Sequence, residues 1–265
     1  MKQIIEKWYK DLGFSSIYDR DFYELLSAYT AEEDVSVDTY AYEKHDAQYN
    51  LLSYLYMCEN MKKGYAEKGI GLDILYATLK DIRFYAQIWS ELKGKLCLAG
   101  EYEWLKRHLG MRLFRLGRLQ FCMGKSEHTI PEKGLFAGDN VLEIHIPDDG
   151  PLTPAACQAS IEMAHTFFAK YFPEFQYKHF TCDSWLLDIT IKDLLREGSN
   201  ILAFQELFDI TERKKSDRIF RYIFKWDSTR DNINNAFCKS KFAELVKARA
   251  LAGGDFYEAL GILKV

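Results

Sequence analysis

The chain has little proline, and the few prolines it has are gathered together. In 265 residues they occur only at positions 131, 147, 151, 154 and 173. Because proline lacks a backbone N–H and interrupts regular structure, the proline-free stretch before residue 131 is open to long helices. The later window of prolines indicates turns and a change of architecture.

The sequence also lacks the patterns of membrane, secreted and zinc proteins. It contains no 18-residue apolar run, so no transmembrane helix is expected, and charges interrupt the first residues, MKQIIEKWYKDLGF, unlike a secretory signal. The cysteines are scattered, without a CxxC pair or a zinc-ligand spacing; they lie at 58, 97, 122, 157, 182 and 238. We therefore expect reduced thiols in a cytoplasmic protein, with no metal site and no membrane contact.

Positive charge is not in excess. The chain has 35 Lys and Arg against 39 Asp and Glu, a net charge of −4, whereas a nucleic-acid surface normally shows a basic excess. Nucleic acid is therefore not an expected partner, and the oligomeric state stays open. Aromatic residues, in contrast, make up 15% of the chain, which predicts thick aromatic cores with rings left over for a pocket or an interface.

The first part of the chain shows helical periodicity. Apolar residues recur at helical spacing and glycines separate the segments; the segments span residues 18–29, 46–69, 71–94 and 100–110. These patterns predict a helical N-terminal domain over residues 1–110.

From residue 111 the pattern changes to strands that alternate with helices. Strands are predicted at 112–123, 141–147, 179–187, 218–226 and 255–265, and helices at 153–172, 191–208 and 239–253. The 112–123 segment is also compatible with a helix, and the 191–208 helix is expected to break at Gly198-Ser199. The fold class is therefore α+β: the helical domain is followed by a mixed-sheet α/β domain over residues 111–265.

The segment NVLEIHIPDDGPLTPAACQASIEMAHTFF, residues 140–168, combines a strand, a tight turn and a capped helix. Strand alternation places Glu143 and His145 on the same side, where both can reach one pocket as base and polariser. Thr153 is a natural N-cap before Pro154, and the positive end of the helix that follows favours anions. The competing interpretation is a polar strand face and an ordinary connection without a ligand.

Further candidates lie in HFTCDSWLL, residues 179–187. Cys182 and Ser184 share one face there; a packed thiol is the expected state of Cys182, and Ser184 is a candidate proton donor or acceptor. The GxSxG motif of hydrolases is absent. Tyr222 is a candidate proton donor or a core residue, and His108 and His165 are expected at the surface or between domains.

Four segments, in this order, resemble a bacterial family of acyltransferases whose activity is assigned from their fold; they are RLFRLGRLQF, VLEIHIPDDGPLTP, HFTCDSWLLD and SNILAFQELF. Members have a helical N-terminal domain and a C-terminal domain similar to the GNAT N-acyltransferase fold. The resemblance runs from about residue 70 to the end of the chain.

The resemblance implies that acetyl-CoA or another acyl-CoA enters between the strand at Glu143 to Pro147 and the strand at 179–187. It implies cofactor contacts from the first strand and the loop after it, at Ile144, Ile146, Gly150, Leu152 and Thr153. It implies catalysis near Glu143, His145 and Ser184, and a small amine or amino-acid-like acceptor.

The loop departs from the family pattern. DDGPLTPAA has one glycine, two prolines and no basic residue, where the family carries glycines and a basic or amide side chain. Arg112, Arg115 and Arg118 are candidates to supply phosphate contacts from elsewhere, or they form a solvated face. The departure keeps a second hypothesis open: a non-catalytic, GNAT-shaped module that binds a small molecule or a partner protein.

Overall fold

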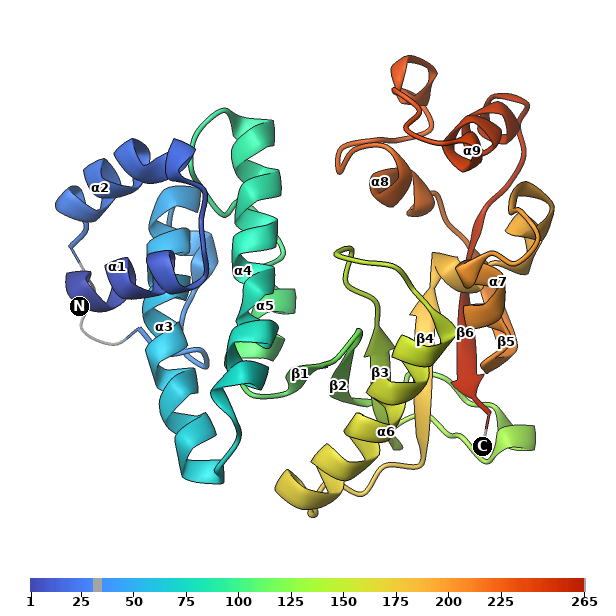
Figure 1. Cartoon of the computed structure of the whole chain (residues 1–265), viewed down its shortest axis with the longest axis horizontal. Coiled ribbons are helices and arrows are strands. Elements are labelled where there is room, and N and C mark those ends of the chain that lie inside the picture. Colours follow the sequence, from blue (N-terminus) through green and yellow to red (C-terminus); the bar gives the residue numbers. More distant parts are fainter. Residues whose placement is uncertain (31–34, 265) are drawn as a thin grey trace. The chain divides into compact units, whose positions relative to one another are not determined.

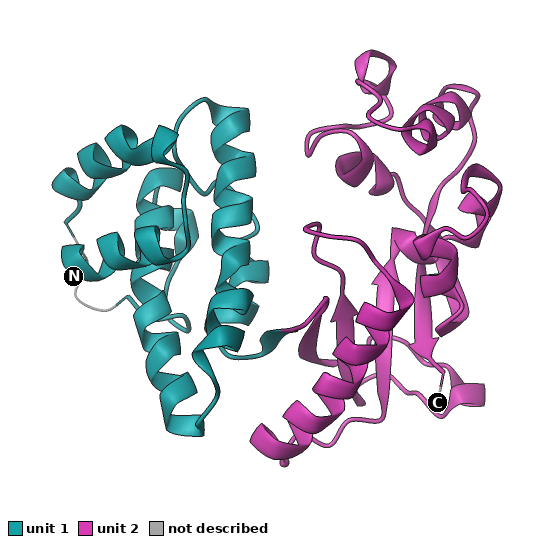
Figure 2. Ribbon diagram, in the orientation of Figure 1, with its two compact units in different colours: residues 1–115 teal, residues 116–265 magenta. Residues whose placement is uncertain are grey.

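The computed structural model describes residues 1–30 and 35–264. The chain divides into two compact units, Met1–Arg115 and Leu116–Val265, which Figure 2 shows in different colours. We call them the helical unit and the sheet unit and describe each by itself.

The helical unit contains the helices predicted from periodicity. They are α2 (Asp19–Ala28), α3 (Ala47–Lys68), α4 (Leu72–Lys93) and α5 (Tyr102–Leu109), as labelled in Figure 1. A further helix, α1 (Lys2–Asp11), precedes them; the sequence pattern does not predict it.

Local capping explains where the long helices begin and end. The Asp46 carboxylate accepts hydrogen bonds from the backbone N–H groups of Gln48 and Tyr49, both at 2.8 Å, and so caps α3. Gly69 ends α3 with φ of 70° and Gly94 ends α4 with φ of 68°, left-handed conformations that glycine adopts at little cost.

Helix α3 forms the centre of the helical unit, because it buries side chains around its circumference, among them Tyr54, Leu55, Met57 and Cys58. His108 contacts residues of this unit, and its burial shows that the surface alternative of its prediction is wrong. Its side chain is fully buried, with Nε2 3.0 Å from Asp81 Oδ2 and Nδ1 3.0 Å from the Trp104 carbonyl. Two polar partners offset the cost of burying the imidazole.

The sheet unit is built on a six-stranded sheet in the order β1-β2-β3-β4-β6-β5. The strands are β1 (Leu113–Leu116), in which the division between units falls, β2 (Leu119–Lys125), β3 (Asn140–His145), β4 (His179–Ser184), β5 (Phe208–Lys215) and β6 (Tyr257–Leu263). Strands β3 and β4 are parallel, whereas the pairs β2–β3, β4–β6 and β5–β6 are antiparallel. The predicted mixed sheet is confirmed.

The helices of this unit are α6 (Pro154–Tyr171), α7 (Asn200–Gln205), α8 (Ile219–Ile223) and α9 (Lys241–Leu251). Helices α6 and α9 and strands β3, β4 and β6 confirm predictions. Val265, the last residue of the predicted 255–265 strand, lies outside the described residues.

The predicted single strand at 112–123 is wrong, and so is its helical alternative. The segment forms two strands, β1 and β2, with Gly117 between them at φ of 70°. A glycine in that conformation allows the chain to reverse direction. Apolar residues continue on both sides of Gly117, so the sequence pattern shows no break there.

The predicted strand at 218–226 is also wrong. Its aromatic and β-branched residues favour a strand, yet Ile219, Phe220 and Phe224 lie in a core with Val246 and Phe256, and the segment forms α8. The strand in this region is β5, which was not predicted. Only Phe208 of β5 is buried, because β5 lies at the edge of the sheet, and its many charges give no alternating apolar signal.

The predicted helix at 191–208 is divided. Residues Ile189–Leu194 form 3-10 turns, and α7 begins after Ser199, whose hydroxyl accepts the N–H of Ile201. The expected break at Gly198-Ser199 is confirmed. Helix α7 ends at Gln205, and β5 begins shortly after it, at Phe208.

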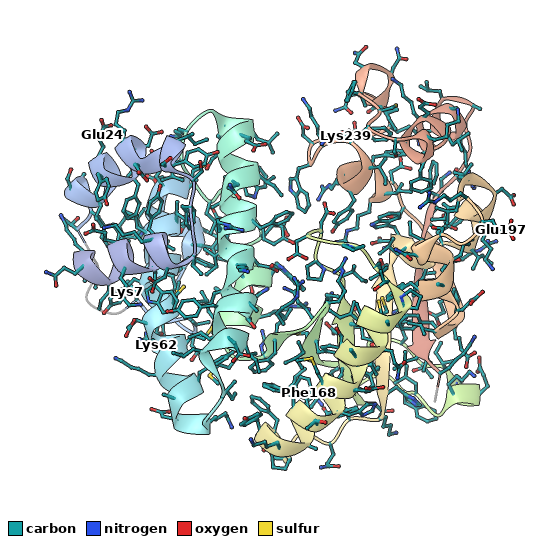
Figure 3. The ribbon with its side chains drawn as sticks, in the orientation of Figure 1. Lys7, Glu24, Lys62, Phe168, Glu197 and Lys239 are labelled. Atoms are coloured by element: carbon teal, nitrogen blue, oxygen red, sulfur yellow. The ribbon has the colours of Figure 1, made fainter. Side chains whose placement is uncertain are left out.

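The two faces of the sheet are covered differently. Helix α6 lies across one face, where its His165 packs edge-on to Phe180 of β4 at 4.8 Å, and Phe168, labelled in Figure 3, is buried. On the other face the connection between β2 and β3 contributes Ile130 and Leu135 to a small core with residues of β3 and β6. Charged side chains such as Glu197 and Lys239 extend from the periphery (Figure 3).

Candidate active site

The candidate site lies where the two parallel strands of the sheet separate. Strands β3 and β4 pair from Val141 opposite His179 to Glu143 opposite Thr181. Beyond this point β3 continues to His145 and β4 to Ser184, without further pairing between them. The strands therefore diverge after Glu143, and the backbone of β3 loses its neighbour on that side.

Glu143 and His145 meet at this opening. His145 Nε2 lies 3.3 Å from Glu143 Oε2, and their side chains are 27% and 28% exposed. Strand alternation places both on one face, so the predicted proximity of the two side chains is observed. A carboxylate accepts hydrogen bonds, so the geometry fits a tautomer of His145 in which Nε2 donates to Glu143 and Nδ1 faces away from it.

Gly124 of β2 provides the space that the Glu143 carboxylate occupies. A Cβ at residue 124 would lie 2.8 Å from Glu143 Cδ, closer than side-chain carbons normally approach. The sequence offered one signal for this contact, since a glycine inside a strand often marks a close approach by another group.

Asp183 follows Thr181 on the same face of β4 as Glu143. Its side chain is exposed, yet the surrounding chain raises the pKa of its carboxyl, and the nearby Glu258 carboxylate adds to this effect. Glu258 itself pairs with Arg218 at 2.6 Å. The sequence analysis missed Asp183 as a site residue, because only the strand order brings β6 beside β4.

The loop after β3 leads into the start of α6. Thr153 accepts the Ala156 N–H at 3.4 Å and Pro154 occupies the first turn, as the cap prediction requires. Arg118, from the turn between β1 and β2, donates to the carbonyls of Gly150 at 2.8 Å and Pro151 at 3.0 Å. A basic group thus reaches the loop, although the loop contains none of its own.

The structure places the predicted cofactor-binding residues at different depths. Ile144 is buried on the face opposite Glu143, toward α6, and Leu152 is also buried. Ile146 and Thr153 are half-buried, and Gly150 is exposed.

Ser184 is not brought together with Glu143 and His145. It lies on the opposite face of β4, with Cys182, and its hydroxyl accepts the N–H of Leu186 at 3.2 Å, where it caps a short turn. Cys182 is 1% exposed and burial raises the pKa of its thiol, so it is a packed thiol. Tyr222, on α8, is 36% exposed and stacks on Trp185 at 6.0 Å.

Metal ligands and membrane spans are absent from the described part of the chain. Residues 1–30 and 35–264 contain no group of three or more His, Cys, Asp or Glu side chains able to hold a metal ion. Within the same residues, no helix has the length and apolar character needed to span a bilayer.

A separate hollow of about 600 Å³ runs along the edge strand β5 and contains none of the predicted site residues. It is lined by Gln205, Phe208 and Ile210 and by several charged side chains. Two of its lysines are engaged, Lys133 with Asp209 and Lys264 with the Glu206 carbonyl. The hollow therefore lies apart from the opening beside Glu143 and His145.

A mixed sheet whose parallel strands diverge beside a strand, loop and helix start defines the GNAT class of fold. In agreement with this, residues 113–263 match the family model described as the GNAT-like C-terminal domain, and residues 6–111 match the N-acyltransferase N-terminal domain. The chain belongs to this family.

Solved structures show the same fold at low sequence identity. One, an acyltransferase in complex with decanoyl-CoA and teicoplanin, is 21% identical with a TM-score of 0.81, and the match covers 98% of this chain and 87% of that chain. Another, an acyltransferase in complex with decanoyl-CoA, is 23% identical with a TM-score of 0.72, over 94% of this chain and 77% of that chain. No curated protein matches the chain significantly.

Proposed function

We propose that the chain transfers an acyl group from acyl-CoA to the amine of a small acceptor. The observation that carries the proposal is the Glu143–His145 pair at the point where β3 and β4 diverge. Family membership supports the acyl-transfer chemistry. The complexes of similar structures with decanoyl-CoA and octanoyl-CoA support acyl-CoA as the donor.

In the proposed reaction the neutral amine attacks the thioester carbonyl. The new C–N bond forms as the C–S bond breaks, the CoA thiolate leaves, and the amine's proton must be removed. His145 Nδ1 accepts that proton, while the Glu143 carboxylate holds Nε2–H and stabilises the imidazolium that results. The proton then reaches the thiolate or solvent, so atoms and charge balance.

The donor is proposed to lie along β3, with its pantetheine arm beside Ile144 and Ile146 and its phosphates near Gly150, Leu152 and Thr153. The end of the β3–β4 pairing at Glu143 supports the first placement, because an extended arm can hydrogen-bond to a strand on the side where the neighbouring strand no longer pairs with it. The capped start of α6 supports the second, because a helix N-terminus favours anions. Ser184 lies on the opposite face from the pair and has no role in this scheme.

The test begins with binding. Calorimetry and thermal shift with CoA, acetyl-CoA and decanoyl-CoA should show binding that raises the melting temperature as the ligand concentration increases. The comparison of a short with a long acyl chain is chosen because similar structures hold long ones. No binding of any of the three at millimolar concentration would refute the proposal and leave the non-catalytic module.

Turnover then distinguishes catalysis from binding. Glu143→Gln and His145→Ala should each lower kcat by about a hundredfold, the usual contribution of general base catalysis, with CoA affinity nearly unchanged. His165→Ala is the matched control, because His165 is an exposed histidine of α6 on the other face of the sheet. If both site variants lose affinity but keep kcat, the pair binds ligand and does not catalyse.

A further inference from the structure

The loop at 148–153 presents an electrostatic difficulty for an anionic ligand. Asp148 and Asp149 are exposed, and the loop carries no Lys or Arg of its own. Carboxylates that lie beside a diphosphate repel it, because like charges a few ångströms apart interact unfavourably even in water. A positive group from another part of the chain would favour a diphosphate at this loop.

Arg118 is held where it can provide that charge. Its backbone N–H and that of Leu119 both donate to Ser160 Oγ of α6, at 2.7 and 3.2 Å. Its guanidinium donates from Nη2 to the Gly150 carbonyl and from Nε to the Pro151 carbonyl. One residue thus ties the β1–β2 turn to both the helix and the loop.

These two hydrogen bonds determine how the loop peptides are oriented. In a trans peptide the C=O and N–H point in opposite directions, so a Pro151 carbonyl turned toward Arg118 directs the Leu152 N–H away from it. The Gly150–Pro151 peptide has no N–H to direct. The carbonyl oxygens of Gly150 and Pro151 therefore face Arg118, and the N–H of Leu152 faces the opposite side of the loop.

Two backbone N–H groups of the loop, that of Leu152 and the next one along the chain, are candidates to bind a ligand. Within residues 1–30 and 35–264 the N–H groups of Leu152 and Thr153 make no hydrogen bond, although Leu152 is only 8% exposed. An unpaired N–H group in a buried residue is costly, so the N–H of Leu152 in particular is suited to a ligand oxygen. A Cβ at Gly150 would meet no atom within 4 Å, which shows that the loop has an open side at this residue.

The charge of Arg118 also reaches the first turn of α6. Burial raises the pKa of the Cys157 thiol, and the positive charge of Arg118 opposes that effect. The guanidinium thus adds to the positive end of the helix at the place where phosphate oxygens would lie.

We infer that Arg118 is the positioning residue of a diphosphate-binding loop: it turns the carbonyls of Gly150 and Pro151 away from the ligand and adds the positive charge that the loop lacks. The inference rests on the proposed function, because the diphosphate is that of CoA. Arg118 acts through the loop and is not itself a catalytic residue.

The experiment compares CoA with pantetheine, which has the same thiol arm but no diphosphate or nucleotide. By calorimetry, Arg118→Gln should weaken CoA binding by about tenfold or more and change pantetheine binding by less than about twofold. Arg118→Lys keeps the charge but loses the two-pronged donor, so it should resemble Arg118→Gln more than the wild type. Lys170→Gln, at the far end of α6, removes the same charge and should leave both affinities unchanged.

Each outcome decides the inference. If Arg118→Lys binds CoA like the wild type, or if CoA and pantetheine weaken in parallel, the positioning role is refuted while the proposed function stands. If the wild type itself binds no CoA, the proposed function fails first. Should the variants not fold, the wild-type amide resonances of Leu152 and Thr153 must shift with CoA and not with pantetheine; unchanged resonances refute the inference.

Discussion

The carboxylate of Glu143 occupies the space that a side chain on Gly124 would fill, since a Cβ at residue 124 would lie 2.8 Å from Glu143 Cδ. The two residues belong to neighbouring antiparallel strands, β2 and β3. The absence of a side chain at one position therefore sets the orientation of the acid at the other.

Gly124→Ala should displace the Glu143 carboxylate and break its hydrogen bond with His145. We expect kcat for acyl transfer to fall by about tenfold or more, with little change in CoA affinity, because the altered contact is the one between Glu143 and His145. The shorter side chain of Glu143→Asp makes room for the new methyl group. The double variant should therefore lose less activity than the two single losses combined, measured as a double-mutant cycle; strictly additive losses would contradict the contact.

Cys182 should be dispensable and unreactive. Burial raises the pKa of its thiol, so the thiolate needed for nucleophilic attack is scarce. We expect Cys182→Ala to retain turnover within about twofold, and alkylation followed by mass spectrometry to label the half-buried Cys238 before Cys182. Rapid labelling of Cys182 in the folded protein would contradict this expectation.

Asp183 should make stability depend on pH. Although part of the side chain is exposed, the protein around its carboxyl excludes enough water to raise its folded-state pKa, and Glu258 raises it further, against the opposing charges of His128, Arg218 and Lys214. A raised carboxyl pKa means that the folded state binds the proton more tightly than the unfolded state does. The contribution of Asp183 to stability is therefore greatest in acid. It is lost as the pH rises from the pKa of the unfolded state, about 3.9, through the higher pKa of the folded state. At neutral pH Asp183→Asn should therefore melt at the same or a higher temperature than the wild type, and this difference should shrink in acid. A lower melting temperature for Asp183→Asn at neutral pH would show that the ionised carboxylate stabilises the fold.

Asp188 should be important for stability. It is 2% exposed and accepts hydrogen bonds from the N–H and hydroxyl of Thr190 and from the N–H of Tyr257 on β6. Asp188→Ala leaves these donors unsatisfied, and we expect the free energy of unfolding to fall by on the order of 3 kcal/mol, measured by urea denaturation. Asp193→Ala provides the control, since Asp193 is an exposed aspartate of the same region; equal losses in the two variants would contradict the role of the buried carboxylate.

Several features of the fold could be predicted because they depend on neighbours in the sequence. The cap at Thr153 and the helix-ending Gly69 and Gly94 act through groups only a few residues away, so they could be recognised from the sequence. The shared side of Glu143 and His145 follows from the two-residue period of a strand, which holds whatever lies beside it.

Other features could not be predicted, because distant parts of the chain decide them. The aromatic segment around Phe220 forms a helix since its rings are needed in a core with Val246 and Phe256, and β5 is recognisable only from its pairing with β6. The sequence analysis named Arg118 as a candidate phosphate contact, but only the fold shows that it reaches the loop carbonyls.

The sequence by itself thus determined the local elements and the residues that share a face of each strand, because hydrogen bonding and side-chain direction repeat over a few residues. Only the tertiary structure decided that β4 lies parallel to β3, that the two part after Glu143, and that Gly124 and Arg118 support the groups beside the opening. Pairing between strands and contacts across long chain separations depend on burial of the whole sheet, which no short segment encodes.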